Sequence, residues 1–246
     1  MLPDLNLKLL HQRGNKLFLL QQNNLLLYDI ELKEFIFNLE FDDIKITLLI
    51  SDDKHFYYYS NDGKIYCIAL QTLTKVYDFY PGGLVNAMLV DDGKLYISTY
   101  SHQLFGIHIH DLVTGKGILT KFFIFPLKLI KIIDNKLYIL SHKIMYINLL
   151  NNYQIKEING YLGLKCLDVN NELLVSSCSD GVINFQDRKD LNMISTIKIN
   201  ADIINIQILN DVVYFLVSNQ SKSLYSIDSD LVINLISSGV DKFLIG

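Results

Sequence analysis

The hydrophobic residues of this chain fall in short runs of about four to six that are separated by turn-forming residues. Val, Ile, Tyr and Phe dominate these runs and helical periodicity is poor, so the pattern predicts strands rather than helices. Residues 173–187, LLVSSCSDGVINFQD, show the form most clearly: an apolar strand, a Ser-Asp-Gly turn, and a second apolar strand that ends on Asp187. Asn, Asp and Gly fill the predicted turns because they tolerate positive φ and suit tight hairpins.

This strand-turn-strand pattern recurs along the whole chain. We take as its marker the residue that ends the second apolar strand of each unit, which gives the series Asp29, Ala69, Ile109, Asn148, Asp187 and Asp228. Successive markers are 40, 40, 39, 39 and 41 residues apart. Each unit divides into four short strands, so the spacing predicts six copies of one four-stranded unit.

Many predicted strands, such as VVYFLV and KLYIL, are apolar on both faces. Strands of this kind normally belong to parallel sheets covered by helices, but no helical crossovers are present, so small antiparallel sheets must stack face to face. Four-stranded units with a period of about 40 residues are typical of the blades of a β-propeller. We therefore predict an all-β fold with six blades, at about residues 5–41, 42–81, 82–126, 127–161, 162–200 and 201–238.

The predicted blades form a single domain over residues 1–246, although the chain is long enough for one large domain or two small ones. After the sixth blade, residues 239–246, GVDKFLIG, have the pattern of the first strand of another repeat. Three arrangements are open. The tail packs against the first blade, or the ring closes without a shared strand, or the tail begins an incomplete seventh blade.

The repeat resembles the WD40 family, whose third strand typically closes on Trp-Asp. The matching pairs here are Tyr28-Asp29, Gln186-Asp187 and Ile227-Asp228. The chain departs from that pattern because it has no tryptophan and no Gly-His pair before any blade, so the Asp-His-Ser-Trp network of the family cannot form. Residues 92–107 also resemble quinoprotein-like and YVTN-type propellers. The resemblance implies a propeller that serves as a binding scaffold.

The amino-acid composition excludes several classes of function. The net charge of -4 supplies no global field to attract nucleic acid or an anionic membrane. Residues 122–133, the most apolar segment, are interrupted by Pro126, Lys128 and Lys131 and cannot span a membrane. The N-terminus lacks the basic and apolar regions of a signal peptide. The three cysteines, Cys67, Cys166 and Cys178, show no CxxC spacing, so we expect a reducing compartment, cytoplasm or nucleus.

His108 and His110 are the strongest candidates for metal chemistry. They are two residues apart, so on a strand they share a face, where two imidazoles and Asp111 have the ligand types that zinc takes. No third ligand has a recognisable spacing, and we favour polar residues at a blade edge. The acidic pairs at 42–43, 52–53 and 91–92 fall at predicted turns, where Asp is favoured for backbone reasons. We predict no catalytic residues, metal, cofactor or small-molecule substrate, because no nucleophile elbow or nucleotide-binding pattern is present.

The sequence offers better candidates for a binding surface than for a catalytic or metal site. We label the four strands of a blade a to d in chain order; partners of propellers usually dock on the d–a and b–c loops or in the central channel. Tyr80, Tyr100 and His102 place amphipathic side chains on the face that these loops form, and they are the predicted contact residues for a protein partner; the alternative is that each ring folds back onto its blade. The densest basic stretch holds Lys116, Lys121, Lys128 and Lys131, which either contact RNA or protect a sheet edge from strand addition.

Together these features predict a non-catalytic, WD40-like scaffold that mediates protein–protein interactions within a larger intracellular complex. One alternative is a ribosome-associated or other ribonucleoprotein-associated subunit, which rests on the lysine stretch alone. A second alternative is a propeller enzyme or metal-binding protein that uses the region of His108 and His110.

Overall fold

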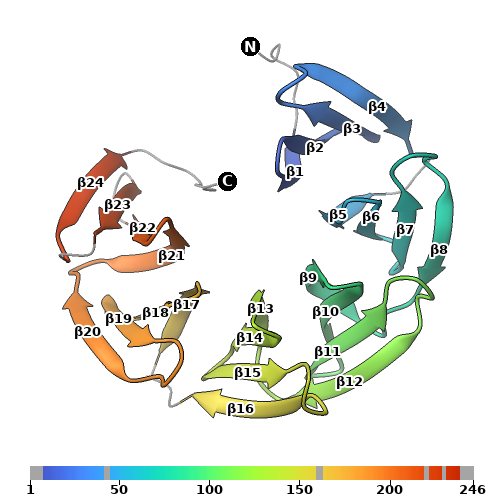
Figure 1. Cartoon of the computed structure of the whole chain (residues 1–246). Helices are drawn as coiled ribbons and strands as arrows, with labels where there is room; N and C mark the ends of the chain where they lie inside the picture. Colours follow the sequence, from blue (N-terminus) through green and yellow to red (C-terminus); the bar gives the residue numbers. More distant parts are fainter. Residues whose placement is uncertain (1–7, 42–44, 159–162, 219–221, 229–230, 239–246) are drawn as a thin grey trace. The chain divides into compact units, whose positions relative to one another are not determined.

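The computed structural model describes residues 8–41, 45–158, 163–218, 222–228 and 231–238. All regular structure in these segments is β, and it forms six antiparallel sheets of four strands each. Every sheet contains four strands that follow one another in the chain and lie side by side in that order (Figure 1). The six four-stranded units predicted from the spacing are therefore confirmed, and we call them blades 1 to 6.

The strand bounds are as follows. Blade 1 has β1 (Lys8–Arg13), β2 (Lys16–Gln21), β3 (Asn24–Asp29) and β4 (Glu34–Glu40); blade 2 has β5 (Ile46–Ser51), β6 (His55–Ser60), β7 (Ile65–Ala69) and β8 (Lys75–Phe79). Blade 3 has β9 (Leu84–Asp91), β10 (Lys94–Ser101), β11 (Leu104–Asp111) and β12 (Gly117–Phe123); blade 4 has β13 (Lys128–Ile133), β14 (Lys136–Leu140), β15 (Ile144–Asn148) and β16 (Gln154–Ile158). Blade 5 has β17 (Leu164–Val169), β18 (Leu173–Cys178), β19 (Val182–Asp187) and β20 (Met193–Lys198); blade 6 has β21 (Asp202–Leu209), β22 (Val212–Ser218), β23 (Ser223–Ile227) and β24 (Ile233–Ser238).

The blades group into two compact units that divide after Ile124, with blades 1 to 3 in the first and blades 4 to 6 in the second. Within the first unit, β1 contacts β5 and β5 contacts β9. Within the second, β17 contacts both β13 and β21. In each unit the a strands of neighbouring blades are therefore adjacent, and the d strands form the outer edges of the sheets (Figure 1).

Face-to-face packing of blades explains why so many strands are apolar on both faces. In β6, Phe56 and Tyr58 pack with Phe18 and other residues of blade 1. The alternate residues of the same strand, Tyr57 and Tyr59, pack with residues of blade 3. Because successive side chains of a strand point to opposite faces, a strand between two blades buries side chains on both faces and is largely apolar. Similar cores lie between blades 4 and 5 and between blades 5 and 6.

The turn between strands c and d is closed by the last residue of strand c. In four blades a side-chain oxygen of that residue accepts hydrogen bonds from the backbone amides two and three positions later, at 2.7–3.2 Å; the residues are Asp29, Asp111, Asn148 and Asp187. In blade 2 the same position holds Ala69, which has no side-chain oxygen.

The repeat marker in blade 3 was placed wrongly by the sequence. Strand β11 ends on Asp111, not on Ile109, and the capping carboxylate belongs to Asp111. The sequence pattern did not reveal this strand end, because the polar residues His108 and His110 interrupt the apolar run that marks the strand. Strand β23 of blade 6 likewise ends on Ile227, one residue before Asp228, whose carboxylate accepts the amide of Val232 at 3.0 Å.

The residue that follows this marker ties the c–d turn to the a–b turn of the same blade. Its backbone amide donates to a backbone carbonyl in the a–b turn at 2.8–3.0 Å; the pairs are Ile30 to Asn15, Leu70 to Lys54, Leu112 to Gly93, Leu149 to Asn135 and Arg188 to Glu172. The bond recurs in blades 1 to 5, so the a–b and c–d turns form one end of each of these blades. The b–c turns and d–a connections lie at the other end.

Blades 4, 5 and 6 are also joined by buried polar groups. Asp168 on β17 accepts the Nζ of Lys131, on blade 4, at 3.2 Å, and the backbone amide of Ile208, on blade 6, at 2.7 Å. Arg188 donates its Nε to the carbonyl of Asn171 at 2.8 Å and also pairs with Asp134 of blade 4. Both Asp168 and Arg188 are buried, so these contacts fix the spacing between blades.

The described residues do not test several of the predictions. The tail strand at 239–246 and the acidic pair at 42–43 lie outside the described residues. The single-domain organisation and the mode of closure stay predictions. Cys67, Cys166 and Cys178 are buried free thiols. Across the segments that the structure describes, no helix is long and apolar enough to cross a membrane.

Candidate interaction surface

A groove of about 510 Å³ lies between blades 2 and 3 at the end that carries the b–c turns and d–a connections. We call it the aromatic groove; its lining residues are Tyr59, Gly63, Tyr80, Gly82, Gly83, Leu84, Tyr100, Ser101 and His102. The structure thus brings together Tyr80, Tyr100 and His102, the three contact residues predicted from loop position. Their role in binding a partner stays a prediction.

Tyr80, Pro81, Gly82 and Gly83 form the connection from β8 to β9, and its two glycines shape one wall of the groove. Gly82 has a φ of 82°, a conformation that residues with a Cβ rarely adopt. A Cβ on Gly83 would lie 2.8 Å from the backbone oxygen of Tyr100 and 3.0 Å from the Cβ of Ser101. The connection therefore packs backbone to backbone against the β10–β11 hairpin, which only glycine permits at this position.

The opposite wall is the β10–β11 hairpin. His102 and Gln103 have φ values of 46° and 67°, as expected of a two-residue hairpin turn with both central residues in the left-handed region. Tyr100 precedes the turn, and its ring contacts Phe105 across the hairpin with centroids 4.8 Å apart. This contact holds Tyr100 in place while 39% of its surface stays exposed.

Tyr80 is the most exposed tyrosine of the groove, at 68%. The Nζ of Lys64 lies 5.1 Å from its ring centroid and also pairs with Asp78 at 3.2 Å. Hydrogen bonds from Lys75 and Lys64 lower the pKa of Asp78, so this carboxylate stays charged and keeps the ammonium of Lys64 beside the ring. The groove therefore offers aromatic faces, tyrosine hydroxyls and one cation to a partner.

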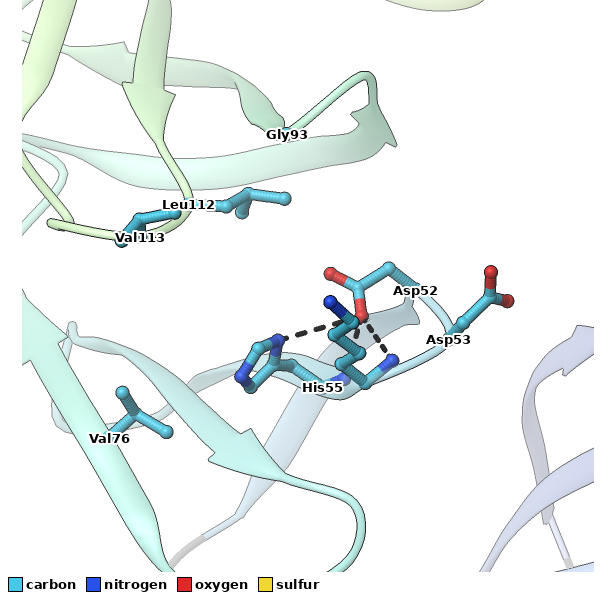
Figure 2. A pocket seen from close by; sticks show the side chains of 8 residues that line it. Asp52, Asp53, His55, Val76, Gly93, Leu112 and Val113 are labelled. Atoms are coloured by element: carbon cyan, nitrogen blue, oxygen red, sulfur yellow. Dashed lines mark hydrogen bonds and ion pairs between the residues drawn. The ribbon is translucent and has the colours of Figure 1, made fainter.

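A second groove, of about 430 Å³, lies at the opposite end of blades 2 and 3 (Figure 2). Val76 and His55 border it on the blade 2 side, and Leu112 and Val113 border it on the blade 3 side. Its acidic groups are occupied by the chain itself. Asp52 accepts the amides of Lys54 and His55, both at 2.7 Å, and the hydroxyl of Tyr57 at 2.9 Å.

Asp53 in the same turn pairs with Arg13 of blade 1 at 3.1 Å. The sequence pattern predicts a turn at the acidic pair 52–53, and the hydrogen bonds from backbone amides to Asp52 agree with that prediction. The groove itself was missed, because nothing in a single strand or turn shows that two blades leave space between their turns.

His108 and His110 share a face of β11, as predicted, but both ring nitrogens of His108 and the Nδ1 of His110 have hydrogen-bond partners within the protein. His108 lies between Thr99 and Thr120, with Nε2 2.8 Å from the first hydroxyl and Nδ1 3.1 Å from the second. The Nδ1 of His110 lies 3.1 Å from the carbonyl oxygen of Gly115. Burial lowers the pKa of both imidazoles. Among the described residues, no group of three or more His, Cys, Asp or Glu side chains is placed to hold a metal ion.

The predicted lysines do not line either groove. Lys116 lies in the β11–β12 turn, Lys121 lies opposite Ile107 in the middle of β12, and Lys128 begins β13 in the other unit. Lys131 is paired with Asp168. The lysine stretch is therefore not a single surface within blade 3, and no comparison with a known protein supports a ribonucleoprotein contact.

No protein-family model matches the chain, and no curated protein sequence matches it. Solved structures do match in fold. Hsv2p of Kluyveromyces lactis superposes with a TM-score of 0.71 at 11% identity, over 91% of this chain and 74% of that one. The computationally designed Ika8 protein gives 0.70 at 12% identity, over 93% and 70%.

A chain in the crystal structure of the mitotic checkpoint complex gives a TM-score of 0.68 at 13% identity, over 91% of this chain and 73% of that one. At these identities the likeness concerns the fold alone. The predicted resemblance to WD40-type propellers is confirmed at that level: the chain has a β-propeller fold with six four-stranded blades.

Proposed function

We propose that this protein is a non-catalytic scaffold that binds a protein partner through the aromatic groove. The observation that supports this function is the convergence of Tyr80, Tyr100 and His102 on one groove, although Tyr80 comes from the β8–β9 connection and the other two come from the β10–β11 hairpin. Exposed tyrosines combine a large apolar ring with a hydrogen-bonding hydroxyl, and they are enriched among the residues that dominate binding energy at interfaces.

Other exposed apolar residues lie at the same end of blade 3. Leu84 lines the groove with 63% of its surface exposed, and Leu104 of the adjacent hairpin is 41% exposed. Phe122, opposite Gly106 on β12, lies near the same end of blade 3 and is 63% exposed. Contiguous exposed apolar side chains with a polar border are typical of protein-binding sites.

The fold comparisons are consistent with a scaffold. A propeller of this kind is present in the mitotic checkpoint complex, which shows that the fold can work inside an assembly. In this chain the histidines that suggested metal chemistry hydrogen-bond to its own threonines and backbone. We place the role in the cytoplasm or nucleus, because three free, buried thiols are typical of a reducing compartment.

The test is site-specific photocrosslinking in native extract. A photoreactive phenylalanine analogue replaces Tyr80, and in a matched control it replaces Leu150, which is 78% exposed in the β15–β16 turn. We expect one protein to crosslink from position 80 and not from position 150. With that partner purified, Tyr80→Ala and Tyr100→Ala should each weaken its binding by about tenfold or more, as expected of central interface aromatics.

A second pair of variants separates groove shape from aromatic content. Gly83→Ala should weaken binding because its Cβ must displace the backbone of Tyr100, which lies 2.8 Å away. Gly117→Ala is the matched control, since the nearest atom to its Cβ would be 3.8 Å away. A partner that binds all of these variants with wild-type affinity, or a chemical turnover by the isolated chain that the tyrosine variants abolish, would contradict the proposed function.

A further inference from the structure

The d strand of blade 6 differs from the d strands of the other blades. Strand β24 pairs with β23 along one edge, and within the described residues its other edge has no strand partner, as is also true of the d strand in each of the other five sheets (Figure 1). All six of its residues are exposed, whereas every other d strand has at least one partly or fully buried residue. Its apolar side chains, Ile233, Leu235 and Ile236, are 43%, 60% and 52% exposed.

The second difference is charge. Each of the other five d strands carries at least one charged side chain: Glu34 and Glu40 in β4, Lys75 and Asp78 in β8, Lys121 in β12, Lys156 and Glu157 in β16, and Lys198 in β20. Strand β24, with the sequence INLISS, carries none. Charged residues on an edge strand, lysine above all, discourage pairing with another chain. The protection that the other blades possess is therefore absent from β24.

We propose that β24 pairs antiparallel with β24 of a second copy of this protein and joins the two sixth blades into one continuous sheet. The regular part of the strand is 233–235, because a bulge in its pairing with β23 lies at the following residue. A two-fold axis perpendicular to the sheet requires that a residue face its own copy. With Asn234 at that position, Ile233 lies opposite Leu235 of the second copy.

In this register apolar side chains lie opposite apolar side chains, and the two copies of Asn234 lie opposite each other. Successive residues of a strand point to opposite faces, so Ile233 and Leu235 share a face and meet the same two side chains of the second copy. Asn234 lies on the other face, where the two amide groups can hydrogen-bond to each other. Strand β24 itself carries no charge that this pairing would bury. The pattern of β24 is thus complementary to itself, which favours a second copy over an unrelated strand.

Sedimentation velocity of the full chain tests the proposal. Over about 1–200 µM we expect a monomer–dimer equilibrium, the range in which a small interface associates. Asn234→Lys places two ammonium groups opposite each other and should weaken association by at least about tenfold. The matched control is Ile194→Lys on β20, at a position that is 58% exposed, and it should leave association unchanged. Unaltered circular dichroism shows that both variants fold.

A cysteine at the proposed axis tests the register. In the dimer, Asn234→Cys places two thiols opposite each other within disulfide reach, so an added copper–phenanthroline oxidant should crosslink the copies. The three native cysteines are buried, and Ile194→Cys is the control. The proposal is overturned if the full chain stays monomeric, if Asn234→Lys associates like the wild type, or if association appears only after residues 239–246 are removed, since the chain's own end would then occupy the edge.

Discussion

At the residue scale, the best-defined polar feature of the first unit is the ladder of Thr99, His108 and Thr120 across β10, β11 and β12. The position of His108, three residues before the end of strand c, is occupied in blade 5 by Asn184, which accepts a hydrogen bond from Thr196 at 3.3 Å and contacts the sulfur of Cys178 at 3.7 Å. The same register therefore holds a three-strand polar ladder in two blades, once with an imidazole and once with an amide.

The lowered pKa values of three histidines, one of them in this ladder, predict that the free energy of unfolding depends on pH. Burial, and then the neighbouring His110, lower the pKa of His108; burial lowers that of His110; and burial with Arg13 lowers that of His11 to about 4. An unfolded histidine titrates near pH 6.5. Below about pH 6.5 the unfolded chain takes up protons that the folded chain does not, so the free energy of unfolding falls as the pH falls.

His108→Asn should keep the ladder and reduce this loss. At about pH 5 the contribution of one histidine is at most about 2 kcal/mol, the limit set by titration of the unfolded chain. Urea unfolding of the variant between about pH 7 and pH 5 measures the change in slope. His102→Asn, in the exposed β10–β11 turn, controls for loss of a histidine as such. An unchanged slope in His108→Asn would contradict this assignment.

At the element scale, the c–d turn shows how one side chain completes a structure that the backbone already specifies. The backbone bonds of this turn are alike in blades 2, 3 and 5: the amide four residues after Ala69, Asp111 or Asp187 donates to its carbonyl at 2.8–2.9 Å. Blades 3 and 5 add a carboxylate that accepts two further amides. Blade 2 lacks this cap, because its turn begins with alanine.

Ala69→Asp should therefore stabilise the protein by about 0.5–1 kcal/mol, since the new carboxylate can accept two backbone amides that no side chain now caps. Ala69→Asn should retain much of the gain, as Asn148 does in blade 4. Ala69→Leu, which has no acceptor, is the matched control. Chemical denaturation measures all three, and a gain in the leucine variant equal to that of aspartate would show that capping is not the cause.

At this scale the sequence predicted well. Strand positions and turns follow from local chemistry: Asp180 and Gly181 form the predicted b–c turn, with Gly181 at a φ of 81°. Errors arose where local chemistry is ambiguous. The polar residues His108, which is buried, and His110, which is half-buried, obscured the end of β11 at Asp111. The space between blades could not be predicted, because it depends on how the turns of two sheets meet.

At the scale of the whole molecule, contacts between blades decide the cooperativity of each unit. Asp168 is the clearest case: it is 8% exposed and touches Lys131 of blade 4 and the amide of Ile208 of blade 6. Asp168 stands within the mostly apolar run GLKCLDV, a signal that the sequence-based prediction did not use. The sequence did not show which groups it would meet, since its partners lie 37 and 40 residues away.

Asp168→Ala should lower the free energy of unfolding by about 2–4 kcal/mol, because it leaves a buried backbone amide and a cation without their shared acceptor. The matched control is Asp202→Ala, which removes an exposed ion pair with Lys165 and should cost less than about 1 kcal/mol. Thermal and urea unfolding compare the two variants. Equal losses in both would show that Asp168 contributes no more than a surface charge.

The backbone hydrogen bond between the c–d and a–b turns also bears on how far such a protein can diverge. Its donor residue is Ile30, Leu70, Leu112, Leu149 or Arg188, according to the blade. Because every residue except proline supplies a backbone amide, substitution at this position does not remove the bond. The blade can therefore lose its signature residues one by one and keep its geometry. The chain matches the fold of propellers with which it shares only 11–13% identity.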